Sequence, residues 1–166
     1  SFAAHARAIG AEVADFTLQD YRGRAVSLSD YGQQRVVVLV FLGTECPLAK
    51  LYGHRLSQLD QQYEDRDVAS LGLNSNVQDS ITELAASARR HGIEFPLLKD
   101  VGNHLADAVA ATRTPEALVL DDQRRIRYRG RIDDQYEVGY VREMASRHDL
   151  RAAVDAVSRR WRSAFA

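Results

Sequence analysis

The longest continuous run of apolar residues lies at 36–42 (Val-Val-Val-Leu-Val-Phe-Leu). The run does not alternate with polar residues and is rich in β-branched side chains, so it predicts a central strand that is covered on both faces. Gly43 and Thr44 interrupt the run, and Pro47 suits the first turn of a helix because its missing N–H would have no intrahelical partner there. The pattern therefore predicts strand, tight turn and helix, with Cys46 at or next to the helix N-terminus.

A helix and a second strand are expected after this turn. Apolar residues recur at spacings of three and four beyond Cys46 and predict an amphipathic helix that ends near Arg66. Residues 67–73 predict the next strand, and residues 74–76 leave it as a polar turn. A strand, a crossover helix and another strand imply parallel pairing of the two strands.

Two more helices are expected in the middle of the chain. One covers about residues 80–91, with Asp79 or Ser80 as its N-cap and Gly92 as its stop. A short, alanine-rich helix is expected at 102–111. Helices between successive strands are typical of an α/β domain.

The remaining patterns predict hairpins, an insertion and a final helix. A brief extended piece is expected at 94–98, a charged surface insertion at about 131–148, and an amphipathic helix from Asp149. The chain thus predicts a mixed sheet with helices on both faces, and Cys46 at the carboxyl edge where such sheets bind ligands. Two pairs of short stretches predict β-hairpins: residues 13–18 with 25–28, and residues 116–120 with 126–128.

Length and charge narrow the function classes. At 166 residues the chain is expected to form one domain spanning 1–166. With 22 basic and 23 acidic side chains it has no net field that would recruit nucleic acid or an anionic membrane. The apolar run at 36–42 is far shorter than the ~18 residues of a membrane span. The N-terminal residues lack an initiator Met and a signal-peptide core, so we expect a cut end of a longer protein.

The single cysteine is the strongest candidate for chemistry. At a helix N-terminus, unpaired backbone N–H groups and the helix dipole favour the thiolate of Cys46 over the thiol. Thr44 has two open roles: it donates its hydroxyl to the sulfur, or it caps the helix, which we favour. Lys50 and Arg113 are candidates to stabilise a thiolate, and Glu45 is either a proton carrier or a plain loop acid.

No metal site or cofactor is expected. The five histidines are scattered, and none has a second ligand type at i+4. Asp133 and Asp134 could hold a cation, but we expect them to pair with Arg129 and Arg131 in a salt-bridged loop.

Three motifs resemble the redoxin group of the thioredoxin fold, which includes the thioredoxin-like proteins of cytochrome maturation and the peroxiredoxins. The motifs are residues 41–47, 95–100 and 114–121, and the resemblance covers about residues 10–130. It implies an α/β thioredoxin-like fold with an N-terminal β-hairpin. It also implies that the Thr114–Pro115 bond is cis and that this loop packs against the cysteine.

Departures from the group's patterns change the expected chemistry. The second cysteine of the thioredoxin motif is replaced by Ala49, and the aromatic residue before the first is Glu45. The peroxiredoxin threonine is replaced by Gly43, and its arginine position appears at Pro115, with Arg113 out of register. The resemblance therefore implies one reactive cysteine without an internal resolving thiol.

The sequence predicts a thiol-dependent oxidoreductase that uses Cys46 and an external resolving thiol. Its partners would be a protein or small-molecule thiol, disulfide or hydroperoxide. The alternatives are a one-cysteine peroxidase, or a non-catalytic module that docks a partner or a fused domain. Residues 128–134 and the insertion resemble a redoxin subgroup of bacterial multidomain proteins that are often exported, which favours an extracytoplasmic, periplasmic location.

Overall fold

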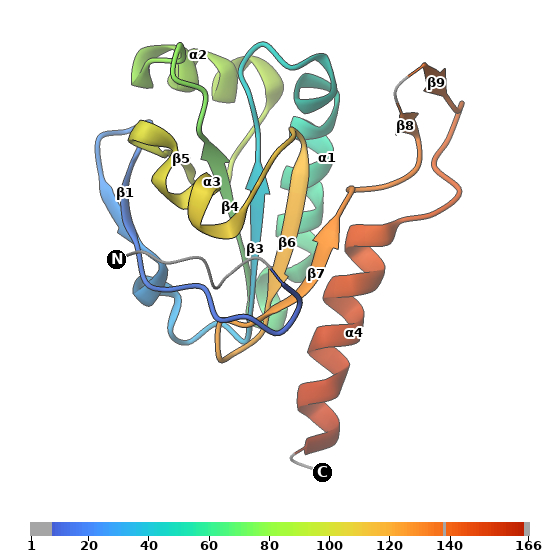
Figure 1. Cartoon of the computed structure of the whole chain (residues 1–166). Helices are drawn as coiled ribbons and strands as arrows, with labels where there is room; N and C mark the ends of the chain where they lie inside the picture. Colours follow the sequence, from blue (N-terminus) through green and yellow to red (C-terminus); the bar gives the residue numbers. More distant parts are fainter. Residues whose placement is uncertain (1–7, 138, 165–166) are drawn as a thin grey trace.

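The computed structural model describes residues 8–137 and 139–164 and shows one mixed seven-stranded sheet flanked by helices (Figure 1). The strand order is β2-β1-β5-β4-β3-β6-β7. The pairs β3–β4 and β4–β5 are parallel, and the other pairs of this sheet are antiparallel. The predicted mixed sheet and thioredoxin-like fold are confirmed. The strands are β1 (Thr17–Asp20), β2 (Ala25–Ser27), β3 (Val36–Phe41), β4 (Val68–Asn74), β5 (Leu97–Lys99), β6 (Glu116–Leu120) and β7 (Ile126–Gly130).

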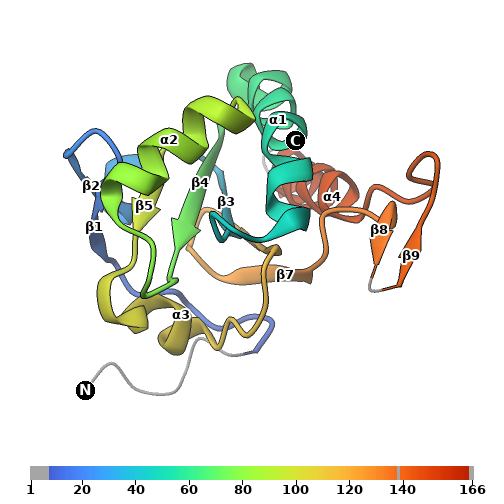
Figure 2. The same cartoon turned by 90° about the horizontal axis from the view of Figure 1, so that it is seen from above.

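Helices cover both faces of the sheet, as the views of Figures 1 and 2 show. One face carries α1 (Pro47–Tyr63), α2 (Ile81–His91) and α4 (Asp149–Ala164). The other face carries the short α3 (His104–Val109) and the segment before β1. Three 3₁₀ turns complete these elements: Leu28–Tyr31, Glu64–Arg66 and Val101–Asn103.

The central strand β3 is buried on both sides, as its sequence predicts. Every second side chain joins the apolar cluster under α1 and α2, and the others join the cluster under α3. Each of its six residues is at most 2% exposed. Because full burial of one such side chain stabilises a fold by about 1.5–3 kcal/mol, β3 is a rigid base for the loop that follows it.

The predicted helix boundaries are correct for α1 and α2 and too wide for α3. Ser80 and Glu83 form a capping box at the start of α2, and Gly92 ends the helix in the left-handed region. The third helix spans only His104–Val109 instead of 102–111. It is shorter because Gly102 and Asn103 have positive φ angles, which an α-helix does not accommodate.

The insertion at 131–148 contains a small hairpin, β8 (Tyr136–Glu137) and β9 (Tyr140–Val141), that projects from the body of the molecule (Figure 1). Its first part is not on the surface, because Ile132, Asp133 and Asp134 are buried.

The expected pairing of Asp133 and Asp134 with Arg129 and Arg131 is wrong. The chain turns after β7, so the two arginines reach β6 and α4 while the aspartates face α1 and the insertion. All four residues form ion pairs with other partners: Asp133 with Arg55, Asp134 with Arg142, Arg129 with Glu116, and Arg131 with Asp149.

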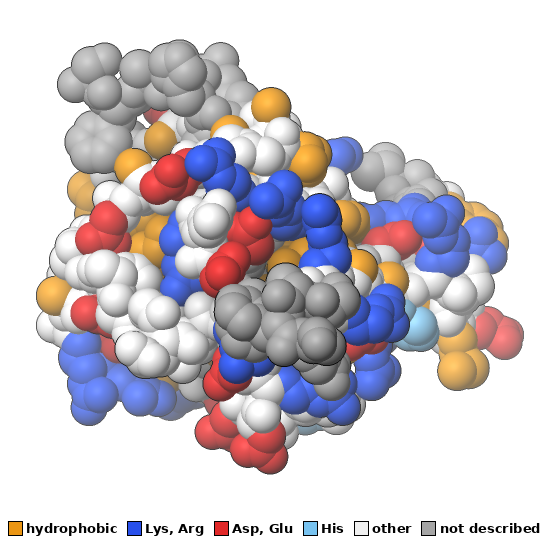
Figure 3. All heavy atoms as spheres, turned by 90° about the horizontal axis from the view of Figure 1, so that it is seen from below, with side chains coloured by type: hydrophobic (Ala, Val, Ile, Leu, Met, Phe, Trp, Pro, Cys, Tyr) orange, Lys and Arg blue, Asp and Glu red, His pale blue; other side chains and the backbone are white. Residues whose placement is uncertain are grey.

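The end of the molecule opposite the loop after β3 carries charges of both signs. Figure 3 shows Lys and Arg side chains interspersed with Asp and Glu side chains on this face. This mixture agrees with the formal net charge of −1 and gives this face no field of a single sign. No helix in the described ranges is both long and apolar enough to cross a membrane.

Candidate active site around Cys46

Cys46 lies at the end of the loop that joins β3 to α1, and it is the N-cap residue of that helix. Pro47 occupies the first turn, as its missing N–H predicts. The side chain of Cys46 is half-buried, and its thiol donates a hydrogen bond to the carbonyl oxygen of Thr114 at an Sγ–O distance of 3.4 Å. The Thr114–Pro115 bond is cis, as the resemblance implies. Strand β3 and the cis-proline loop thus present one thiol between them.

A groove of about 340 Å³ opens beside this thiol. One wall is formed by the loop after β3 with Cys46, and another by Ser75 and Asn76 at the end of β4. The third wall is formed by α3 and residues 111–114. Arg113 is exposed and lines the same groove as Cys46. The groove leaves the half-buried side chain of Cys46 accessible from outside.

Gly43 leaves free space directly beside the cysteine. A Cβ atom at this position would lie 3.6 Å from Cys46 Cβ and 3.7 Å from Thr114 Oγ1, which are ordinary contact distances. This is the position at which the peroxiredoxin pattern has a threonine. The missing side chain therefore removes a hydroxyl from the immediate surroundings of the thiol.

Thr44 does not cap α1, so the favoured expectation for its side chain is wrong. The N-cap is Cys46, and no side chain caps the helix. Thr44 is buried, and its N–H donates to Asp79 Oδ2 at 3.1 Å. Thr44 thus bonds the buried carboxylate of Asp79 beneath the loop and not the start of α1.

The other predicted pocket residues do not line the groove or lie outside the described side chains. Glu45 and Pro47 are exposed, and neither lines the groove beside Cys46. The side chain of Lys50 lies outside the described residues. Among the described residues, no three His, Cys, Asp or Glu side chains gather as a metal site.

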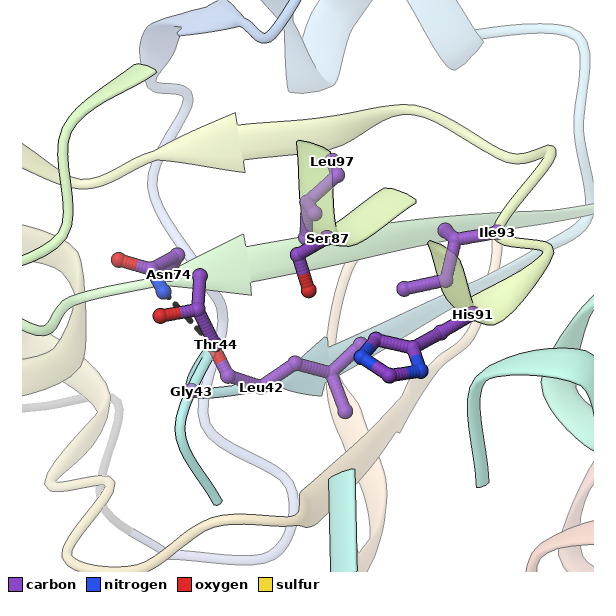
Figure 4. A pocket seen from close by; sticks show the side chains of 8 residues that line it. All are labelled: Leu42, Gly43, Thr44, Asn74, Ser87, His91, Ile93 and Leu97. Atoms are coloured by element: carbon purple, nitrogen blue, oxygen red, sulfur yellow. Dashed lines mark hydrogen bonds between the residues drawn. The ribbon is translucent and has the colours of Figure 1, made fainter. Parts of the chain in front are cut away.

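A buried polar network beneath the loop was missed by sequence reasoning. Asn74 is 1% exposed, and its amide donates to the carbonyl oxygen of Leu42 at 3.1 Å and to Asp79 Oδ2 at 2.7 Å. Lys99 is also buried, and its ammonium donates to Asn74 Oδ1 at 2.9 Å and to the carbonyl oxygen of Asn76. Figure 4 shows Asn74 reaching the backbone of Leu42. The available signal was a polar residue at the carboxyl end of β4 and another at that of β5.

Burial disfavours the charged forms of Asp79 and Lys99, and their neighbours in the network favour them. Burial alone would raise the pKa of Asp79, but hydrogen bonds from the Thr44 side chain, Asn74 and the Thr44 N–H, and the charge of Lys99, hold it below its usual value. Burial lowers the pKa of Lys99, and Asp79 and Asp100 oppose that change. Asp79 is therefore a carboxylate at neutral pH and acts as a hydrogen-bond acceptor.

A second polar cluster ties the insertion to α1. Asp133 is 2% exposed and accepts from the hydroxyl of Tyr52 and, at 2.5 Å, from Arg55. The rings of Tyr52 and Tyr136 meet edge to face at 5.4 Å. Burial and the hydrogen bond to Asp133 raise the pKa of Tyr52, so its hydroxyl remains a donor.

This fold and this site define a class of proteins: thioredoxin-fold domains that present a cysteine at a helix N-terminus against a cis-proline loop. Residues 9–129 match the model of the AhpC/TSA family, so the chain belongs to this family. The predicted membership of the redoxins, with a single cysteine, is thereby confirmed.

Known proteins resemble the chain in sequence and in structure. The thiol-disulfide oxidoreductase ResA of Halalkalibacterium halodurans is 26% identical over 70% of this chain, which spans 65% of the length of that relative. A hypothetical protein from Sinorhizobium meliloti has a solved structure with a TM-score of 0.84 and 30% identity, covering 92% of this chain and 85% of that one. An uncharacterized conserved protein from Geobacillus kaustophilus follows with a TM-score of 0.82, 28% identity, and coverage of 92% and 82%.

Proposed function

We propose that this chain is a thiol-dependent oxidoreductase in which Cys46 exchanges with disulfides and an external thiol resolves the product. One observation carries the proposal: the thiol of Cys46 lies 3.4 Å from the carbonyl oxygen of Thr114, at the groove formed with the cis-proline loop. The likeness to the ResA thiol-disulfide oxidoreductases supports the same reaction class.

The reaction begins when the Cys46 thiolate attacks one sulfur of a substrate disulfide. A bond forms between Cys46 Sγ and that sulfur, the substrate S–S bond breaks, and the other substrate sulfur leaves as a thiolate. An external thiolate then attacks Cys46 Sγ and releases the bound substrate half as a thiol. The first external thiol is now bound to Cys46 as a mixed disulfide. A second external thiolate attacks the sulfur of that bound thiol, which frees Cys46 as a thiolate and yields a disulfide of the two external thiols. The substrate gains two electrons, and the two external thiols lose them.

The other predicted site residues have supporting roles in this proposal. Pro115 and Thr114 form the wall against which the substrate disulfide lies, and Thr44 fixes the backbone before the cysteine. Arg113, at the groove, meets the substrate side chains, while Glu45 and Pro47 belong to the surface around the helix start. A role of Lys50 in stabilising the thiolate stays a prediction. The extracytoplasmic location stays a prediction, which fractionation of the producing cell would check.

Turnover of a small disulfide tests the proposal. The chain is mixed with hydroxyethyl disulfide and reduced glutathione, and glutathione oxidation is followed in a coupled assay. We expect turnover by the native chain and none above background by Cys46→Ser, which differs by one atom at a half-buried position. Activity that survives in Cys46→Ser would contradict the assignment of the site.

A one-cysteine peroxidase is the second candidate, favoured by the cationic Arg113 on the same groove. In that reaction the thiolate attacks one peroxide oxygen, the O–O bond breaks, and Cys46 becomes a sulfenic acid while the other oxygen leaves as alcohol or water. Stoichiometric hydrogen peroxide would then produce a trappable sulfenic acid. Absence of this adduct, together with disulfide turnover, decides for the first candidate.

A further inference from the structure

The loop before Cys46 is held by the burial of Leu42 and by hydrogen bonds from the residues beneath it. Behind Leu42, Gly43 and Thr44 lies a small cavity of about 10 Å³, which is also lined by Ser87 and His91 of α2 (Figure 4). A space of this size holds about one water molecule, so the packing beneath the loop is incomplete at this point. Polar partners therefore add to the burial of Leu42 in holding the loop.

Those partners converge on one carboxylate. Asp79 Oδ2 accepts from the Thr44 N–H at 3.1 Å and from Asn74 Nδ2 at 2.7 Å, and the same Asn74 nitrogen donates to the Leu42 carbonyl oxygen at 3.1 Å. Asn74 and Asp79 thus bind the loop at Leu42 and at Thr44, the latter two residues before the cysteine. Both residues are at most 5% exposed, so these bonds are shielded from bulk water.

The backbone of Asp79 is itself fixed. Asp79 directly precedes Ser80, whose capping box with Glu83 starts α2, and the Asp79 N–H donates to the Asn76 carbonyl oxygen at 3.1 Å. Lys99 holds Asn74 and the Asn76 carbonyl oxygen at once. Since Asn76 lines the groove opposite the cysteine, the same network fixes two walls of the site.

We propose that Asp79 is a positioning residue of the Cys46 site: its carboxylate holds the Thr44 amide and, through Asn74 and Lys99, sets the cysteine loop relative to segment 75–76. Asp79 touches neither the sulfur nor the substrate, and acts through the backbone that presents Cys46. The catalytic part of this inference rests on the proposed function, whereas the positioning of the loop does not.

The test compares Asp79→Ala with Glu83→Ala. Both substitutions remove a carboxylate at the start of α2, but only that of Asp79 reaches the loop. Amide hydrogen exchange is measured by NMR on the native chain and on both variants. We expect exchange at Thr44 to become at least about tenfold faster in Asp79→Ala, because a buried charged acceptor is lost, while the amides of β3 stay protected. In Glu83→Ala the Thr44 amide should exchange at the native rate.

Kinetics then show whether the loop matters for the reaction. We expect the kcat of disulfide turnover to fall about tenfold in Asp79→Ala with a smaller change in KM, because misplacing the sulfur slows the reacting step. If Asp79→Ala does not fold, Asp79→Asn keeps the side-chain volume and one acceptor oxygen, and should show a smaller acceleration at Thr44.

Two outcomes would overturn the inference. The first is a folded Asp79 variant with native exchange at Thr44, and the second is equal acceleration in Glu83→Ala, which would show general loosening of α2. If the native chain shows no turnover, the proposed function is wrong. The hydrogen-exchange rate of the Thr44 amide in the variants still decides whether Asp79 positions the loop.

Discussion

The hydroxyl of Tyr52 on α1 donates to the carboxylate of Asp133, which lies 81 residues later in the chain. Tyr52 follows Cys46 on the same helix, and Asp133 begins the insertion. This bond makes the insertion part of the structure that supports the cysteine-bearing helix. It also leaves a buried carboxylate dependent on Tyr52 and Arg55.

Tyr52→Phe should destabilise the fold by about 1.5–3 kcal/mol, because a buried charge loses one donor. The ring remains, so the edge-to-face contact with Tyr136 is kept. Tyr63→Phe is the matched control on the same helix: its hydroxyl bonds the half-exposed Asp155 at 2.6 Å, where water can replace it. Urea unfolding measures both variants. If both variants lose the same free energy of unfolding, the bond to the buried Asp133 contributes no more than a bond to a half-exposed carboxylate.

Gly43→Thr should be tolerated and should change the chemistry of Cys46. The added Cβ meets its neighbours at ordinary contact distances, so we expect a stability change below about 1 kcal/mol. The new hydroxyl beside the sulfur should raise the rate of reaction with hydrogen peroxide, since it can donate to the developing charge. The measurement is the loss of free thiol under stoichiometric peroxide. Gly43→Val, of the same shape without the hydroxyl, is the control, and equal rates in both variants would disprove the effect.

Asp60→Asn should stabilise the protein at neutral pH. Burial raises the pKa of Asp60, although its carboxylate accepts the Ser70 N–H at 3.1 Å. An acid with a raised folded pKa destabilises the native state when ionised, and this cost disappears as the pH falls through the folded pKa towards the unfolded value. The amide keeps an acceptor for Ser70 and carries no charge. We expect a gain of a few tenths to about 1 kcal/mol at pH 7.

The gain of Asp60→Asn should shrink to near zero by about pH 3, where the native carboxyl is also neutral. Thermal unfolding between pH 3 and pH 7 follows this change. The exposed Asp65→Asn, just beyond the end of α1, removes a charge of the same sign without a buried carboxyl, and should leave stability nearly unchanged. A gain that is independent of pH would show that ionisation of the buried carboxyl is not responsible, and an equal gain in Asp65→Asn would point to helix-end charge instead of burial.

Local patterns in the sequence were sufficient for most of the fold. The apolar run of β3, Ser80 and Gly92 at the ends of α2, and Pro47 after the cysteine each depend on neighbouring residues, so each could be predicted. The cis form of Pro115 followed from a family resemblance and not from local chemistry.

The contacts that hold the site could not be predicted in the same way. The bond from Thr44 to Asp79 joins residues 35 apart, and that from Arg55 to Asp133 joins residues 78 apart. Local sequence predicts Asn74 as part of a turn and Asp79 as a helix cap, and only the folded sheet places both beneath the cysteine loop. The sequence shows which side chains can form hydrogen bonds, and only the packing of β4, β5 and α2 shows with which partners they form them.

Ala49 stands where the thioredoxin motif has its second cysteine, and this replacement has a kinetic consequence. In the proposed cycle the adduct on Cys46 has no internal route of release, so its lifetime is set by collisions with an outside molecule. Its decay should therefore be first order in the concentration of that thiol, with an intercept near zero. A chain with this chemistry would hold its captured partner for as long as its surroundings are poor in thiols.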